Sequence, residues 1–203
     1  MPGFVEVLSS TQHRLPAPCP GCLWWQTAKQ DATGQASRLE WMRRVEREWG
    51  PPGLMLEDDG ETLAAVQYAP VGKLPRTRIL PLNPPPDDDV LLFCLRGRLG
   101  CRAHDPVRLL HRSMFELRRR GVRRIFAYCR PLEDENLCGL RNLCGLEFLQ
   151  RQGFTVVSGN GQVFLVKAEL VGLIPALKEL RSLLPERRPW TAPSPAMWSS
   201  TRK

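Results

Sequence analysis

The sequence of 203 residues lacks the patterns that mark membrane-spanning, secreted or repetitive proteins. No apolar run approaches the ~20 residues of a membrane-spanning helix, so we expect no such span. The first residues do not combine a charged region with an apolar one, and we therefore expect no secretory signal. The chain also has no internal repeat. These absences, together with the length, predict one main globular domain with a sizeable core.

Cysteine occurs seven times, an odd number that does not suit the paired framework of a secreted disulfide-rich domain. Cys94, Cys129 and Cys144 fall in apolar segments, where a thiol packs as a small hydrophobic group. We therefore expect a reducing compartment, the cytoplasm.

The segment Cys19-Pro20-Gly21-Cys22 allows three interpretations. As half of a zinc site it needs two further ligands, but Cys138 and Cys144 are too widely spaced to form a matching pair. As a redox pair it should follow a strand, whereas prolines precede it. The third interpretation is a tight turn beside two tryptophans that pack on the domain. We expect Cys19 and Cys22 to hold no metal and to form no disulfide.

The formal charge is +8, from 29 basic and 21 acidic residues, and a pI near 9.5 would suit an anionic partner. However, arginine recurs on the outer faces of the expected helices and in the tail, without the interleaved aromatic residues of a base-stacking surface. We therefore do not expect nucleic acid to be the main partner.

The most informative stretch is a strand–helix–strand unit. Apolar runs at Val90–Leu95 and Val122–Tyr128 flank an amphipathic helix at Pro106–Arg120, which predicts two parallel neighbouring strands. Asp105 can cap this helix, and Gly121 is the expected left-handed stop. This unit either serves packing alone or also binds a ligand, in which case the loop before the helix faces a phosphate.

The rest of the chain predicts further elements around this unit. Asp58 to Glu61 has the sequence of a tight hairpin turn. The other expected elements are an edge strand at Gly3–Leu8, a helix at Ser37–Trp49, strands at Leu54–Glu57 and Thr62–Ala69, irregular segments at Pro70–Asp89 and Arg130–Arg141, a helix at Asn142–Gln152, and strands at Phe154–Val157 and Val163–Leu170. We place the domain at 1–184, with an N-terminal Cys/Trp-rich extension at 1–36, a core at 37–170 and a last helix at 171–184. A basic Pro/Ser-rich tail at 185–203 should be disordered.

This order of elements resembles the GNAT superfamily of acyl-coenzyme A-dependent N-acetyltransferases. The resemblance covers roughly Ser37 to Leu170, and Asn142 followed eleven residues later by Gly153-Phe154 matches the family spacing. It implies an α/β (α+β) fold with a mixed, mostly antiparallel central sheet. Two parallel middle strands would part in a V-shaped splay, and helices would cover both faces.

The resemblance also implies a binding site for acetyl-coenzyme A as cosubstrate. Backbone groups of Phe93, Cys94 and Leu95 would bond the pantetheine amides, and Asn142 would contact the coenzyme nearby. The loop before Pro106 would present N–H groups and the positive helix end to the pyrophosphate.

That loop departs from the family pattern, because the glycines that allow close approach to a phosphate are missing. The corresponding positions run Cys101-Arg102-Ala103-His104-Asp105-Pro106. Asp105 would repel an anion. Positive charge from Arg98, Arg102 and His104 could compensate, and Gly100 could shift the turn earlier.

For catalysis, the family mechanism is direct attack of a primary amine on the thioester. Our candidate base is Glu57, with Asp58 next. The family tyrosine that protonates the departing thiolate corresponds to Leu149, so Tyr128, one of two tyrosines, is the candidate acid.

The expected acceptor is a small-molecule or peptide amine. The alternative is a catalytically degenerate GNAT-like module that binds an acyl-coenzyme A or a protein partner. A homodimer could form through an edge strand and the last helix.

Overall fold

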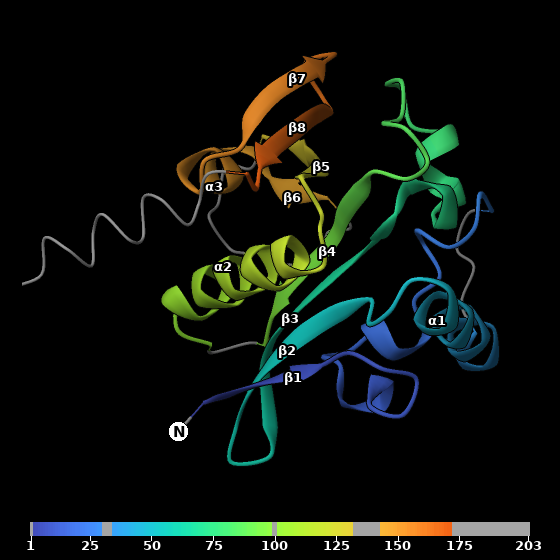
Figure 1. Ribbon diagram of the computed structural model, residues 1–203, viewed down its shortest axis with the longest axis vertical. Helices are drawn as coiled ribbons and strands as arrows, with labels where there is room; N and C mark the ends of the chain where they lie inside the picture. Colours follow the sequence, from blue (N-terminus) through green and yellow to red (C-terminus); the bar gives the residue numbers. More distant parts are fainter. Residues whose placement is uncertain (1, 30–33, 99–100, 132–142, 172–203) are drawn as a thin grey trace, which may run out of the picture. The chain divides into compact units, whose positions relative to one another are not determined.

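A mixed sheet is the frame of the part of the chain that the computed structural model describes, residues 2–29, 34–98, 101–131 and 143–171 (Figure 1). Its strand order is β1-β2-β3-β4-β5-β8-β7, with β6 beside β5. The pairs β4–β5 and β5–β6 are parallel and the others antiparallel. The strands are β1 (Gly3–Glu6), β2 (Gly53–Asp58), β3 (Glu61–Pro70), β4 (Val90–Gly97), β5 (Arg124–Arg130), β6 (Cys144–Gly145), β7 (Thr155–Gly159) and β8 (Phe164–Glu169). The helices are α1 (Gln35–Glu48), α2 (His104–Arg119) and α3 (Leu146–Arg151).

These residues belong to one unit, Met1–Val171. The tail at 185–203 and, apart from Val171, the helix expected at 171–184 lie outside the described residues. Within the described part, no helix is long and apolar enough to cross a membrane.

The hairpin between β2 and β3 forms as the sequence predicts. Asp58 pairs with Glu61, which leaves Asp59 and Gly60 as a two-residue turn. Their φ angles of 48° and 81° are those of a turn in which both central residues are left-handed. Gly60 adopts this conformation without strain, and the hairpin register follows from it.

The central strands of the sheet are covered on both faces, because their side chains alternate between two apolar clusters. The edge strands β1 and β7 are largely exposed. On β4, Val90 and Leu92 pack on the side of α2, whereas Leu91 and Phe93 pack on the side of α1. The α2 side also includes α3, and the α1 side includes the N-terminal segment up to Trp25. The expected arrangement of helices on both faces is confirmed.

Helix α2 buries one apolar stripe, with Leu109, Leu110 and Leu117 fully covered. Each such side chain contributes about 1.5–3 kcal/mol by leaving water. Gly121 has a φ of 84°, and the next N–H, from Val122, bonds back to Leu117. The predicted left-handed stop is therefore confirmed.

The helix expected at Asn142–Gln152 begins later than predicted. Cys144 and Gly145 instead form β6, which pairs with Cys129 and Arg130 of β5, and α3 starts at Leu146. The cause is the edge of β5, which the local sequence around Asn142 does not reveal. At Cys129 and Arg130, the side of β5 toward β4 has no other strand partner among the described residues. Asn142, the expected first residue of this helix, lies outside the described residues, and the N-cap of α3 is Gly145.

The connection at Pro70–Asp89 is more structured than its prolines suggest. It contains two short 3-10 turns, Val71–Lys73 and Pro75–Arg78. Arg76 is buried, and its Nε donates to the carbonyl oxygen of Trp24 at 2.8 Å. This segment therefore holds the N-terminal tryptophans in place.

Candidate active site

The two central parallel strands part after a short ladder. Val90 pairs with Ile125 and Leu91 with Phe126, and no further β4–β5 pair follows in the described residues. Strand β6 lies beside the end of β5, on its edge toward β4. The predicted divergence is confirmed, and beyond Leu91 the β4 edge that faces β5 has no ladder partner among the described residues.

A bulge lies on β4 at this opening. Gln67 of β3 pairs with Cys94 and Tyr68 with Leu92, so Phe93 is an extra residue without a partner on β3. As a result, Phe93 and Cys94 are consecutive residues that both pack on the α1 side. A bulge re-aims the backbone locally, and bulges are common next to active sites.

A carboxylate in the first turn of α2 already bonds a backbone N–H of the preceding loop. Asp105 is 2% exposed, and its Oδ2 accepts a hydrogen bond of 3.1 Å from the backbone N–H of Arg102. Its Oδ1 lies 3.4 Å from the Nε2 of His104 and 3.8 Å from a guanidinium nitrogen of Arg108. Helix α2 begins at His104 rather than Pro106, so Asp105 lies in its first turn and not before it. One N–H that a phosphate could use is thus already bonded.

The three positively charged side chains expected to meet a phosphate are in different situations. Arg98 pairs with Glu61, and His104 lies against Asp105. Arg102 has an exposed side chain with no ion pair in the described part of the chain. Arg102 is therefore the cation most available to an anionic ligand. Gly100 lies outside the described residues.

Tyr128 is placed beside the opening. It lies near the end of β5, and its ring stacks on Trp25 with centroids 6.0 Å apart. Its hydroxyl is buried and has no hydrogen-bond partner among the described residues. Burial raises the pKa of Tyr128 to about 12. An unpartnered buried hydroxyl can donate to a ligand without first breaking another bond.

This pKa predicts a specific alkaline sensitivity. The unfolded chain loses the phenolic proton near the ordinary pKa of 10, whereas the folded chain keeps it up to about 12. The stability that Tyr128 contributes is therefore complete below pH 10 and is lost as the pH rises to about 12. Near pH 11, Tyr128→Phe should avoid about 1 kcal/mol of this loss, measured by urea unfolding of both proteins near pH 9 and near pH 11. Equal losses in the two proteins would contradict the prediction.

Glu57 is not brought to the opening. Its carboxylate is buried, pairs with Arg14, and accepts a hydrogen bond of 3.2 Å from the hydroxyl of Thr62. The strand register puts Gly53, not Glu57, in the row of Gln67 and Cys94. Glu57 lies four residues farther along β2, about 13 Å away along the strand.

The sequence interpretation missed a polar cluster on the α1 side of the bulge. Arg38, Gln67 and Arg96 are all buried there, next to the thiols of Cys19 and Cys94. A signal for Arg38 existed, because it precedes Trp41, Met42 and Val45 by three, four and seven residues and so shares their buried face. Gln67 and Arg96 carry no local signal, since only strand pairing brings them together.

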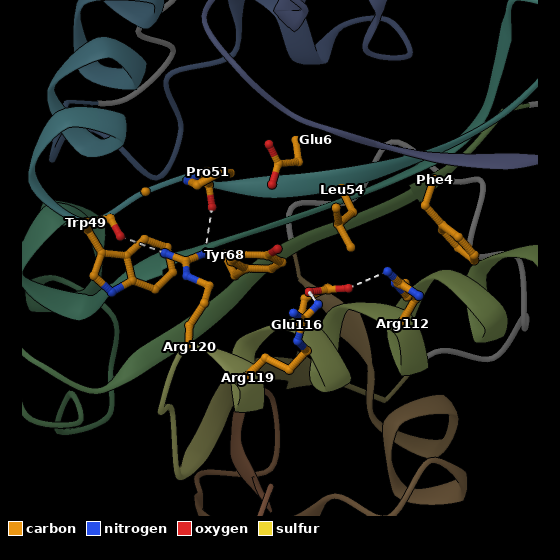
Figure 2. A pocket seen from close by; sticks show the side chains of 11 residues that line it. Phe4, Glu6, Trp49, Pro51, Leu54, Tyr68, Arg112, Glu116, Arg119 and Arg120 are labelled. Carbon is orange, nitrogen blue, oxygen red and sulfur yellow. Dashed lines mark hydrogen bonds and ion pairs between the residues drawn. The ribbon is translucent and has the colours of Figure 1, made fainter.

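A hollow of about 510 Å³, separate from the opening between β4 and β5, lies between β1, β2 and α2 (Figure 2). Its cations are already engaged: Arg112 and Arg119 pair with Glu116. Arg120 lies 3.8 Å above the ring of Trp49 and donates to two backbone carbonyls. Because none of these guanidinium groups is free, the hollow does not suit the phosphates of a coenzyme.

Metal-binding groups do not gather in this region. The described residues contain no group of three or more His, Cys, Asp or Glu side chains that could hold a metal ion. The six described cysteines, Cys19 and Cys22 among them, are free thiols.

Comparison with known proteins adds a fold relationship. No protein-family model matches the chain, and no curated protein matches its sequence. Among solved structures, an N-acetyltransferase from Staphylococcus aureus Mu50 matches with a TM-score of 0.56 and 12% identity, over 84% of this chain and 99% of that one. A ribosomal-protein-alanine N-acetyltransferase from Brucella melitensis matches with a TM-score of 0.55 and 14% identity, over 82% of this chain and 99% of that one. The chain therefore has the fold of the GNAT superfamily of N-acetyltransferases, as its order of elements predicts.

Proposed function

We propose that this chain is an N-acetyltransferase that transfers an acetyl group from acetyl-coenzyme A to a primary amine. The observation that carries the proposal is the parting of β4 and β5 next to the bulge at Phe93. It leaves backbone N–H and C=O groups of β4 available to an extended ligand, which can bond to them as an added strand would. The fold shared with N-acetyltransferases is the second support.

In this proposal, backbone groups of Phe93, Cys94 and Leu95 hold the pantetheine amides. Arg102 meets the pyrophosphate with its guanidinium group, which can form two parallel hydrogen bonds to a phosphate. Arg98 and His104 would have to exchange their present carboxylate partners to join it. Asn142 contacts the coenzyme as the family resemblance implies, and Gly100 shifts the turn before α2 earlier.

Chemistry proceeds by attack of the neutral amine on the thioester carbonyl. A backbone N–H of β4 near the bulge polarises that carbonyl. Tyr128 donates its proton to the departing thiolate, a role for which its neutral, unpartnered hydroxyl is suited. The proton released by the amine passes to water, through which it can reach Glu57, which pairs with Arg14 about 13 Å along β2.

The acceptor is a small-molecule or peptide amine. The Brucella melitensis structure with the same fold is described as a ribosomal-protein-alanine N-acetyltransferase, which is an example of a protein acceptor. We place the reaction in the cytoplasm, which the scattered free thiols favour. The two edges of the sheet, β1 and β7, are where a homodimer could extend it.

Binding and turnover are tested separately. Titration calorimetry with acetyl-coenzyme A measures binding, and release of the coenzyme thiol in the presence of a panel of amines measures transfer. Binding with transfer supports the enzyme. Binding without transfer to any amine supports a second function, a catalytically inactive acyl-coenzyme A-binding module, which the carboxylate in the phosphate loop favours. No binding contradicts both.

Removing the charge of Asp105 should strengthen coenzyme binding. Asp105→Asn keeps an oxygen acceptor for the N–H of Arg102 but removes the buried anion at the start of α2. We expect affinity for acetyl-coenzyme A to rise by about 1–2 kcal/mol, roughly fivefold to thirtyfold, because a charge at a helix end is worth up to that amount. Calorimetry of wild type and variant at the same ionic strength measures the difference.

The matched control is Asp59→Asn, which removes one negative charge from the exposed β2–β3 turn. It should leave the affinity unchanged. If both variants gain equally, the effect comes from net charge, and the phosphates do not lie at the start of α2. If Asp105→Asn gains nothing while wild type binds, the phosphates are likewise elsewhere.

A further inference from the structure

A small buried pocket lies where the N-terminal segment meets β4. Its space is about 30 Å³, enough for a molecule little larger than water. The lining brings together three thiols from distant parts of the chain, Cys19, Cys22 and Cys94. Cys19 is 4% exposed, whereas Cys22 and Cys94 are half-buried. The pocket therefore brings together thiols from the N-terminal segment and from β4.

Two of these thiols interact directly. A hydrogen bond from Cys94 to the sulfur of Cys19 is the main cause that lowers the pKa of Cys19 to about 7, with the charges of Arg96 and Arg38 acting in the same direction. The same hydrogen bond raises the pKa of Cys94. Near pH 7, Cys19 is therefore partly ionised to the thiolate, whereas Cys94 keeps its proton.

Arg38 supplies an independent indication that an anion belongs in the pocket. It is 1% exposed, and one guanidinium nitrogen donates to Gln67. Its Nε and Nη1 are buried without a partner among the described residues. The pocket lining contains no carboxylate that could neutralise this cation. A buried cation without a counter-ion is costly, so an anionic sulfur in the same pocket suits it.

We propose that Cys19 and Cys94 form a peroxide-reactive dithiol, with Cys19 as the attacking thiolate and Cys94 as the resolving thiol. The site would take a small peroxide, for which the pocket has room. This inference does not depend on acetyl transfer. It also differs from the Cys19–Cys22 pair of the sequence motif, because the partner comes from β4.

Oxidation of the pair takes two steps. The Cys19 thiolate attacks one oxygen of hydrogen peroxide, the O–O bond breaks, and the hydroxide that leaves takes up a proton to become water. Cys19 is thereby oxidised to a sulfenic acid and the peroxide is reduced. The Cys94 sulfur then attacks the Cys19 sulfur, an S–S bond replaces the S–O bond, and the second hydroxide leaves as water with the Cys94 proton. The disulfide would tie the N-terminal segment to β4 at the bulge.

The test uses the full chain, treated with hydrogen peroxide in native buffer, alkylated with iodoacetamide, digested and analysed by mass spectrometry. We expect a cross-linked peptide pair containing Cys19 and Cys94, which dithiothreitol separates. In Cys94→Ser the reaction should stop at the sulfenic acid of Cys19, which dimedone traps. Cys129→Ser is the matched control and should leave the cross-link intact, because burial raises the pKa of Cys129 and its neighbour Cys144.

The role of Arg38 is tested by the pH dependence of Cys19 alkylation. In wild type the rate should have its midpoint near pH 7, and in Arg38→Met the midpoint should rise. If that variant does not fold, the wild-type profile and the cross-link still decide. A wild-type midpoint near the ordinary pKa of 9, or Cys19 alkylation no faster than that of Cys129, would overturn the proposal. So would a cross-link between Cys19 and Cys22 in place of Cys94.

Discussion

Replacing Tyr128 by phenylalanine is expected to lower kcat by about a hundredfold or more, with little change in KM for acetyl-coenzyme A. The change removes one hydroxyl that has no partner in the described structure, so the core packing around Trp25 should persist. If that hydroxyl protonates the departing thiolate, its loss removes a contribution of about 10²–10⁴ made only in the transition state. Steady-state kinetics with the best amine from the panel measures both constants.

Tyr68→Phe is the matched control, because Tyr68 is the other tyrosine of the chain and is equally buried. It lies on the α2 side of the sheet, against Trp49, and burial raises its pKa. Its replacement should leave kcat within about twofold, since it is on the face opposite Tyr128. If Tyr128→Phe keeps the wild-type kcat, Tyr128 is not the catalytic acid. That result would not test the coenzyme site.

The central unit was predictable because its signals are local. The continuous apolar run at Val90–Leu95, the helical stripe after Pro106 and the glycine at 121 each act within a few residues along the chain. The Asp59-Gly60 turn fixes the register of β2 and β3 in the same way. The order of these elements resembles that of the GNAT superfamily, and this resemblance predicted the sheet and the parting of its two middle strands.

The missed features depend on contacts between distant segments. Strand β6 has only two residues, Cys144 and Gly145, so it has no periodicity and exists because the end of β5 offers an unpaired edge. Gln67 and Arg96 meet Arg38 only after the sheet has formed. Glu57 was chosen from its place on β2, but Arg14, 43 residues earlier, neutralises it.

The start of α2 was predicted in part: its residue types were predictable from local sequence, but its geometry was not. The sequence predicted correctly that Asp105 would act on the start of the helix, because an aspartate before an apolar helical stripe is a local signal. Its position was wrong: α2 begins two residues earlier than predicted, at His104, and the carboxylate bonds the N–H of Arg102 from within the first turn. Hence the charges around the start of α2 were predictable by residue type but not by geometry.

Trp25→Ala is expected to destabilise the protein by about 3–5 kcal/mol, the usual cost of removing a buried tryptophan. The indole is 3% exposed and packs between Phe93, at 6.3 Å between ring centroids, and Tyr128, at 6.0 Å. Its loss would leave a cavity directly over the bulge of β4, and the neighbouring rings could not close it without moving β4 or β5. Urea unfolding measures the change, and the cost would be a large part of the ~5–15 kcal/mol that stabilises a domain.

Trp24→Ala provides the comparison at the neighbouring position. Trp24 is half-buried and lies under the guanidinium group of Arg76, so its removal should cost only about 1 kcal/mol, much of it from the lost cation–π contact. Trp25→Phe should recover more than half of the loss, because a ring still fills the space between Phe93 and Tyr128. If Trp25→Ala costs no more than Trp24→Ala, the N-terminal segment is not part of the core. The opening between β4 and β5 would then lack the aromatic cover on which the placement of Tyr128 depends.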